Sequence, residues 1–258
     1  KIAASPDLEI QVRLQFQIAQ TLHAVREQHG ALTFGSVEAK PVMRDNEVAD
    51  LKVVRHGPAR EIIESFMIAV NVAMAAFLKQ AGFPSIRRVV RTPRRWDRIR
   101  ELAQARGQSL PQEADPGALS SFLAHEKNAD PLRFPDLSLT VIKLLGPGEY
   151  VMERATDASL GHFGLALHDY THSTAPNRRY ADLITQRSLK ALITGKKMPY
   201  PEAQLAELAS HCTERENAVR KVERLMRKVI AAAALATRIG EAFEAVVTCS
   251  SPKGRNRI

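Results

Sequence analysis

The residues best suited to chemistry lie between Tyr170 and Gly195, where aromatic and imidazole side chains precede a cluster of cations. Apolar residues at helical spacing follow this cluster. The pattern predicts a helix that begins near Pro176 and ends at Gly195, with Ser173 or Thr174 as its N-cap. The start of a helix is a favourable place for an anion, because its N–H groups are unsatisfied there.

Two arginines, Arg178 and Arg179, fall in the first turn of this predicted helix. The positive end of the helix dipole lies at the same place, so two cations are unfavourable there unless an anion compensates them. This conflict favours a phosphate-binding site. An ordinary capped helix with two solvated arginines is the competing interpretation, and the spacing alone does not separate the two.

The composition limits the class of protein. The chain has 258 residues and a net charge of +9, which favours a polyanionic partner such as nucleic acid or an anionic membrane surface. Net charge alone does not choose between these two. The near-apolar run at 229–236 is far shorter than the roughly 20 residues that cross a bilayer, so the chain is expected to be soluble and not held in a membrane. Cys212 and Cys249 lack metal-type or redox-type spacing, which fits free thiols in a reducing compartment and a cytoplasmic location.

The elements that must position the cluster are mainly helical. Apolar periodicity and stop signals predict helices over 5–30, 59–80, 96–106, 116–126, 137–145 and 201–237, the last as one or two helices. Short β-prone runs predict a hairpin from 32–39 and 48–54, a strand at 150–155 and a further β element at 246–247. Within 59–80, Glu64 and Asn71 lie at the margin of the apolar stripe, where a solvated edge is the simpler interpretation.

Two further stretches are rich in charge. The segment 86–100 holds seven arginines around Trp96, which suits a nucleic-acid surface, although a solvated charge run flanking a buried Trp96 explains it equally well. The dense charges at 214–228 fit the solvated side of a helix with i,i+4 pairs.

The segment Phe163–Arg187 resembles the signature of the ribonuclease II and ribonuclease R family, whose consensus is close to Tyr-x-His-Phe-Thr-Ser-Pro-Ile-Arg-Arg-Tyr-x-Asp-Leu. The matching residues are Tyr170, His172, Thr174, Pro176, Arg178, Arg179, Tyr180, Asp182, Leu183 and Arg187. The departures are Ala175 for serine, Asn177 for isoleucine and Gln186 for histidine. The segment 62–78 is similar to the family's Ile-Glu-Glu-x-Met-x-x-Ala-Asn segment, and the resemblance covers nearly the whole chain in the same order.

This resemblance implies a fold and an activity. The fold would be α+β: a helix-rich C-terminal part of an RNB-type catalytic domain over residues 1–238, followed by the beginning of an OB-fold RNA-binding barrel over 239–258. The activity would be that of a 3′→5′ exoribonuclease, a hydrolase that degrades single-stranded RNA to nucleoside 5′-monophosphates. Arg178 would be the catalytic residue at the scissile phosphate, where a bidentate guanidinium suits the charge that develops on the phosphoryl oxygens.

The same resemblance implies an RNA-binding set. Phe34 would stack on a base and Glu223 would contact a sugar hydroxyl. Tyr170, His172 and Arg179 would line the RNA channel or buttress it, beside the phosphate contact already given.

Family members use magnesium held by an aspartate cluster in an Ile-Asp-Asp-Ala-type motif, and no such motif occurs in these 258 residues. We therefore assign no metal ligand in this chain. Either the N-terminal remainder of the same protein carries the magnesium ligands, or the chain is a catalytically inactive RNB-like RNA-binding protein. The start at Lys1 and the incomplete barrel favour a fragment. A basic helical interaction module is a third interpretation.

Overall fold

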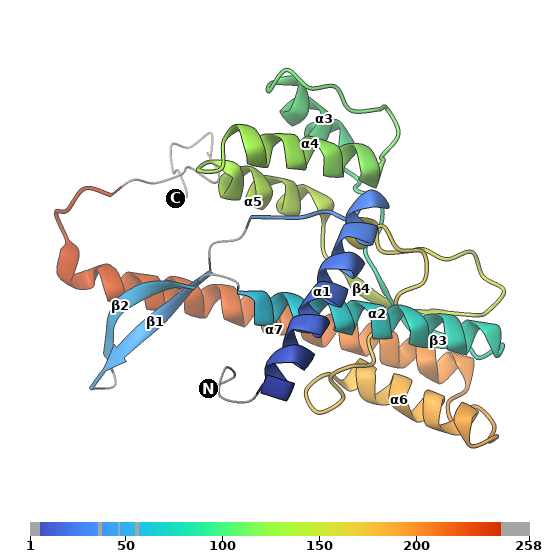
Figure 1. Ribbon diagram of the computed structural model, residues 1–258. Coiled ribbons are helices and arrows are strands. Elements are labelled where there is room, and N and C mark those ends of the chain that lie inside the picture. Colours follow the sequence, from blue (N-terminus) through green and yellow to red (C-terminus); the bar gives the residue numbers. More distant parts are fainter. Residues whose placement is uncertain (1–5, 36–37, 46, 55–56, 244–258) are drawn as a thin grey trace.

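A computed structural model describes residues 6–35, 38–45, 47–54 and 57–243. Its elements in chain order are α1 (Pro6–Gln28), β1 (Glu38–Arg44), β2 (Glu47–Val54), α2 (Pro58–Gln80), β3 (Ser85–Val89), α3 (Trp96–Gln104), α4 (Pro116–Ala129), α5 (Phe134–Leu145), β4 (Glu149–Glu153), η2 (Phe163–Leu165), α6 (Tyr180–Ile193), α7 (Glu202–Leu235) and η3 (Ala236–Arg238) (Figure 1). The expected α+β class with dominant helices is confirmed. The β element predicted at 246–247 lies outside the described residues.

Helix α2 is the central helix of the described fold. Pro58 occupies its first turn, and its apolar face packs against α1, β3 and α6. Its uncharged stretch, 65–78, is longer than the run at 229–236, and α2 is apolar enough over its length to cross a membrane by composition alone. A core helix meets the same test, and the packing of α2 against three other elements accounts for its composition.

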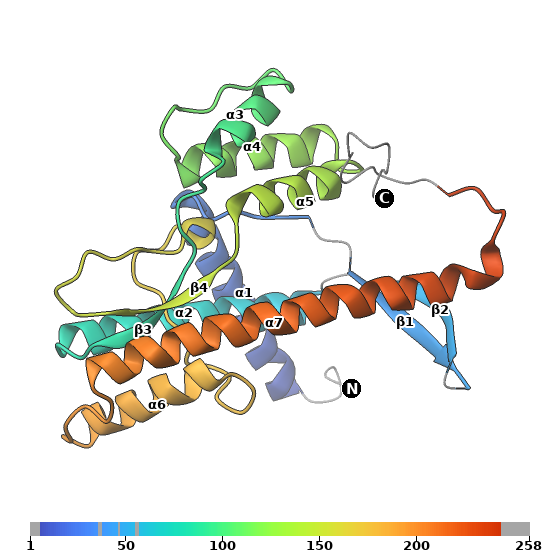
Figure 2. The same cartoon turned by 180° about the vertical axis from the view of Figure 1, so that it is seen from behind.

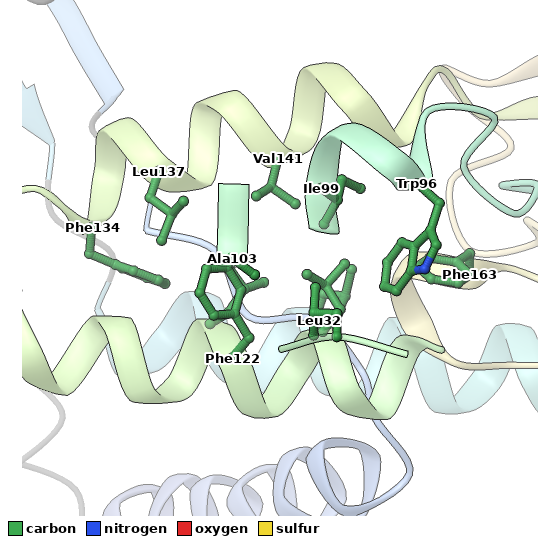
Figure 3. Packing of buried hydrophobic residues seen from close by; sticks show 12 residues of the cluster. Leu32, Trp96, Ile99, Ala103, Phe122, Phe134, Leu137, Val141 and Phe163 are labelled. Carbon is green, nitrogen blue, oxygen red and sulfur yellow. The ribbon is translucent and has the colours of Figure 1, made fainter. Parts of the chain in front are cut away.

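A first hydrophobic cluster joins α3, α4 and α5, which form a group on one side of α2 (Figure 1). Leu32 and Phe163 come from outside these helices and complete the cluster (Figure 3). Trp96 is buried, as in one of the two interpretations of the segment 86–100. Its ring meets the Phe163 ring edge-on with centroids 6.2 Å apart, and its indole N–H donates to the Pro111 carbonyl at 3.0 Å. This cluster fixes the three helices as one unit.

A second cluster lies where β3 and β4 pack on α6 and α7. The two strands pair antiparallel, with Arg88 opposite Tyr150, and Ile86, Ile184 and Leu205 fill the space beneath them. Helix α7 is one long helix, and α6 lies beside its first half (Figure 2). Strand β3 of this second cluster binds the segment that precedes α6.

The predicted hairpin forms between β1 and β2, with Asp45 in a left-handed conformation (φ 49°) at the turn, and β2 contacts α7. The predicted first strand was wrong for residues 32–35. There the Leu32 N–H donates to the Gly164 carbonyl at 2.9 Å and the Gly35 N–H donates to Ser138 Oγ at 3.0 Å, so this segment is tied to the first cluster instead.

The segment 86–100 contains a strand, β3, that the sequence analysis did not predict. Arg87 and Arg88 in β3 are 2% and 7% exposed, so neither a solvated charge run nor a surface patch describes them. The Arg87 guanidinium lies 3.8 Å from the buried Glu153 carboxylate of β4. Strand β3 could not be predicted from its residues, because a buried strand is ordinarily apolar and this one contains two arginines.

We expect Leu119→Ala to lower the free energy of unfolding by about 2–5 kcal/mol, because a fully buried leucine leaves a cavity when it is truncated. Denaturant titration followed by circular dichroism measures this. The control is Leu132→Ala, since Leu132 is 91% exposed and its truncation should change stability by less than about 0.5 kcal/mol. Equal effects in the two variants would contradict the described core.

Candidate active site

The segment before α6, residues 170–179, is fixed to the edge of β3. The Arg88 N–H donates to the Tyr170 carbonyl at 2.9 Å, and the Thr171 hydroxyl donates to the Ile86 carbonyl at 2.6 Å. Thr171 and Ser173 are fully buried. We call this segment the arginine loop, because it ends in Arg178 and Arg179.

Asn71 of α2 holds the arginine loop from the other side. Its side-chain oxygen accepts from the Ser173 N–H at 2.8 Å and from the Ser173 hydroxyl at 3.0 Å, and its amide nitrogen donates to the Tyr170 hydroxyl at 3.2 Å. Asn71 is 1% exposed, so the predicted solvated edge was wrong for this residue. Glu64, two turns earlier, is exposed.

The helix after the loop begins at Tyr180 and not near Pro176. Residues 176–178 form a turn, and Arg179 has an extended backbone (φ −126°, ψ 116°) that separates this turn from α6. Ser173 and Thr174 are therefore not N-caps. Asp182 in the first turn of α6 holds the preceding segment instead: its Oδ1 accepts from the Ala175 N–H at 2.8 Å and from the Arg179 guanidinium at 2.7 Å.

The two arginines of the loop have different surroundings. Arg179 is paired with the buried Asp182, which supplies the compensating anion within the protein. Arg178 is exposed, and its guanidinium has no hydrogen bond or ion pair with any residue that the structure describes. Arg178 is therefore the cation of the loop that is available to a ligand.

Behind the loop, two tyrosines and two histidines form a cluster of rings. The Tyr150 hydroxyl and His172 Nδ1 are 2.9 Å apart, and the Tyr170 ring meets the rings of His162 and His172 edge-on at 5.4 and 5.6 Å between centroids. Tyr170 is 7% exposed. Tyr170 and His172 are among the first residues of the arginine loop, and these contacts anchor that end of it.

Burial decides the charge of this cluster. It lowers the pKa of His172 to about 2, with the charges of Arg179, Arg88, His162 and Arg178 acting in the same direction. Burial also lowers the pKa of His162 to about 4 and raises the pKa of Tyr150 to about 12. The cluster is therefore uncharged at neutral pH, and the nearby cations are not repelled by an imidazolium.

Arg88 connects the cluster to α7. Its guanidinium lies over the Tyr150 ring at 4.7 Å and binds the Glu216 carboxylate through two nitrogens at 2.5 and 3.0 Å. Asn71, Arg88 and Glu216 are parts of the site that were not predicted from the sequence. For Asn71 the similarity of segment 62–78 to the family segment was a usable signal, whereas Glu216 was one charge among many in a charged helix.

Phe34 lies beside a cavity of about 620 Å³ between α1, α2 and the segment 31–34. Its ring is half-buried against the first cluster. Arg26 and Glu64 also line the cavity, and the Arg26 guanidinium donates to Ser65 Oγ at 3.3 Å. Burial lowers the pKa of Arg26, and the proximity of Glu64 and Tyr170 opposes this shift. Ile68 of α2 also lines the cavity, about one turn before Asn71, so the cavity lies along the helix that holds the arginine loop.

Glu223 is exposed on α7 and lines a different cavity, together with Arg220, Lys221, Arg224 and Arg227. The structure therefore brings Tyr170, His172, Arg178 and Arg179 together and places Phe34 in a neighbouring cavity. Glu223 stands apart from both.

Within the described ranges, no group of three or more His, Cys, Asp or Glu side chains is arranged to hold a metal ion. Magnesium needs several oxygen ligands at short distance. The residues described here do not fit such a site by themselves.

Residues 2–195 match the family model of the RNB domain, so this chain belongs to the RNB domain family. It is 32% identical over 246 residues to ribonuclease R of Thermotoga maritima, covering 90% of this chain and 33% of that protein. It is 28% identical to ribonuclease R 1 of Lactococcus lactis, covering 92% and 29%. The chain thus spans about a third of the length of the curated relatives it matches. The expected family is confirmed.

Two solved structures share the fold. RNase R of Mycoplasma genitalium, in complex with ribose methylated single-stranded RNA, matches with a TM-score of 0.83 at 20% identity over 95% of this chain and 39% of that one. Yeast Ssd1, described as a pseudonuclease, matches with a TM-score of 0.58 at 20% identity over 78% and 25%. The fold is therefore common to proteins that differ in their described activity.

We expect Asn71→Leu to lower the free energy of unfolding by about 1–3 kcal/mol, because it leaves the buried Ser173 N–H and Tyr170 hydroxyl without their partner. Hydrogen exchange at the Ser173 amide should accelerate as well. The matched control is Asn128→Leu on the exposed end of α4. Unchanged exchange at Ser173 in the Asn71 variant would show that α2 does not hold the loop.

The neutral imidazoles make stability depend on pH. Below pH 6.5 the unfolded chain binds protons at His162 and His172, whereas the folded protein leaves them neutral down to about 4 and about 2. Stability should fall with decreasing pH, by up to about 1.4 kcal/mol per pH unit for each imidazole. Urea unfolding at several pH values measures this, and His172→Gln should give a shallower slope. Parallel curves for the two proteins would contradict the assignment.

Proposed function

We propose that this protein is a hydrolytic exoribonuclease that degrades single-stranded RNA from its 3′ end and releases nucleoside 5′-monophosphates. Membership of the RNB domain family and similarity to proteins named ribonuclease R support the class of reaction. The observation that carries the proposal for this chain is Arg178, an exposed cation that has no partner among the described residues and lies on a loop that buried hydrogen bonds hold in place.

Arg178 is proposed as the catalytic residue. Its guanidinium would bind the non-bridging oxygens of the scissile phosphate and stabilise the negative charge that grows there in the transition state. It stands just before α6, where the helix dipole also favours an anion. Asn71 and Asp182 fix the backbone on both sides of the loop, so little reorganisation is needed when substrate binds.

The remaining residues of the proposed RNA-binding set have distinct tasks. Phe34 would stack on a base beside the cavity that also contains Arg26, and stacking tolerates any base sequence. Glu223 would accept a hydrogen bond from a ribose hydroxyl, which distinguishes RNA from DNA. We propose that Tyr170, His172 and Arg179 buttress the loop, because their side chains already bind other protein groups.

We further propose that magnesium is needed and that its acidic ligands come from the N-terminal remainder of the protein. The described residues do not fit a metal site, and no step above is assigned to the metal. The beginning of an OB-fold barrel at 239–258 belongs to the same proposal on the strength of the resemblance, and a cytoplasmic location on the strength of the cysteine usage.

A second candidate function is RNA binding without cleavage. It is favoured by the likeness to a protein described as a pseudonuclease and by the lack of a metal-binding group among the described residues. The two functions are separated by incubating the intact native polypeptide with magnesium and an RNA labelled at its 3′ end. Early release of labelled mononucleotide supports the exoribonuclease, whereas retained binding without release supports the second candidate.

Arg178→Ala should lower kcat about 10²–10³-fold with a smaller loss of RNA affinity, because the contact is strongest in the transition state. Arg178→Lys should recover only part of the activity, since a lysine is not bidentate. The matched control is Arg133→Ala, an exposed arginine at the start of α5. Equal losses of kcat and affinity would reduce Arg178 to a tethering residue.

A further inference from the structure

A second concave surface runs along α7. Two adjoining cavities, of about 600 and 380 Å³, share Pro147 and Asn217 in their walls and together make up this surface, which is lined by α7 and the segments 91–95 and 144–149. Its charged lining consists of Arg91, Arg94, Arg95, Arg220, Lys221, Arg224, Arg227, Glu149 and Glu223. Seven cations therefore face two carboxylates, and we call this surface the basic groove.

Part of this charge is neutralised within the protein. Arg91 is paired with Glu149, and Arg220 with Glu216 at 2.7 Å. The charged side-chain groups of Arg94, Lys221 and Arg227 are exposed. They have no hydrogen bond or ion pair with any group in the part of the chain that the structure describes. Like charges gathered in a concave surface repel one another, so the groove is suited to an anionic ligand.

The arrangement fits a ligand with several anionic groups in a row. Arg220, Arg224 and Arg227 lie at i, i+4 and i+7, on one face of α7, and span about 10 Å along the helix axis. Arg94, in the segment before α3, lines the adjoining cavity, which shares Pro147 and Asn217 with the cavity of the three α7 arginines. A single phosphate could reach only part of this row, whereas a nucleic-acid backbone presents one charge per nucleotide.

The groove touches the supports of the arginine loop. Gly148 in its wall packs against Arg88: a Cβ at this position would lie 2.8 Å from the Arg88 guanidinium. Thr213, also in the wall, accepts from the Tyr150 N–H at 2.8 Å. A chain of contacts leads from Gly148 through Arg88 and Tyr150 to His172.

We propose that the basic groove binds the sugar-phosphate backbone of substrate RNA at nucleotides away from the end that reaches Arg178. This inference rests on the proposed function. The groove would hold a long strand through its charges and without reading its sequence, and a short oligonucleotide that fills only the cleavage site would not reach it.

The test is RNA binding by the intact polypeptide, measured by fluorescence anisotropy in chelator so that cleavage plays no part. The variant is Arg94→Gln/Lys221→Gln/Arg227→Gln. The affinity for an RNA of about 30 nucleotides should fall about tenfold or more, while that for an RNA of about 4 nucleotides stays the same. The slope of log affinity against log salt concentration should fall by about 2, near 0.7 for each lost cation.

The matched control is Lys190→Gln/Lys196→Gln/Lys197→Gln, which removes the same charge from the exposed end of α6. That end lies beside the start of α7, away from Arg220–Arg227 in its second half (Figure 2). The control should bind both RNAs as the native protein does. An unchanged affinity and salt slope for the long RNA, an equal loss for the short RNA, or an equal loss in the control would each overturn the inference. None of these outcomes depends on whether Arg178 supports cleavage.

Discussion

The hydrogen bonds of Asn71 are the constraint on which the site depends. A buried amide in the middle of an apolar helix is costly unless every polar atom is satisfied, and here the arginine loop supplies the partners. The loop in turn cannot leave α2 without exposing its own buried N–H and hydroxyl groups. This mutual dependence lets an irregular segment hold a fixed shape without regular secondary structure of its own.

The electrostatics of the site follow from the same burial. Cations surround two imidazole rings that would carry a positive charge themselves if they were protonated. Because burial lowers their pKa, the imidazoles stay neutral. Arg179 and Arg88 each have a carboxylate of their own, Asp182 and Glu216. The one cation of the loop without such a partner in the described chain is Arg178, so the positive charge is presented to solvent at a single point.

Much of the fold could be predicted from local pattern, and part of the site could not. Apolar periodicity located the long helices, because amphipathic spacing is a local property. The strand β3 was missed since its two arginines are buried through partners far away in the chain, Glu153 and Glu216. The start of α6 was misplaced for a similar reason: Pro176 and the residues before it satisfy local helix signals, but the long-range bonds of Ser173 to Asn71 hold the loop in another shape. Whether Phe34 and Glu223 contact RNA stays a prediction.

Glu216 accepts hydrogen bonds from Arg88 through both of its carboxylate oxygens, and Arg220 donates to one of the two, Oε1. One carboxylate is thus shared by the supports of the arginine loop and by the wall of the basic groove. A change at Glu216 therefore acts on both surfaces, because it leaves the buried Arg88 guanidinium without its carboxylate and adds unpaired positive charge to the wall of the groove.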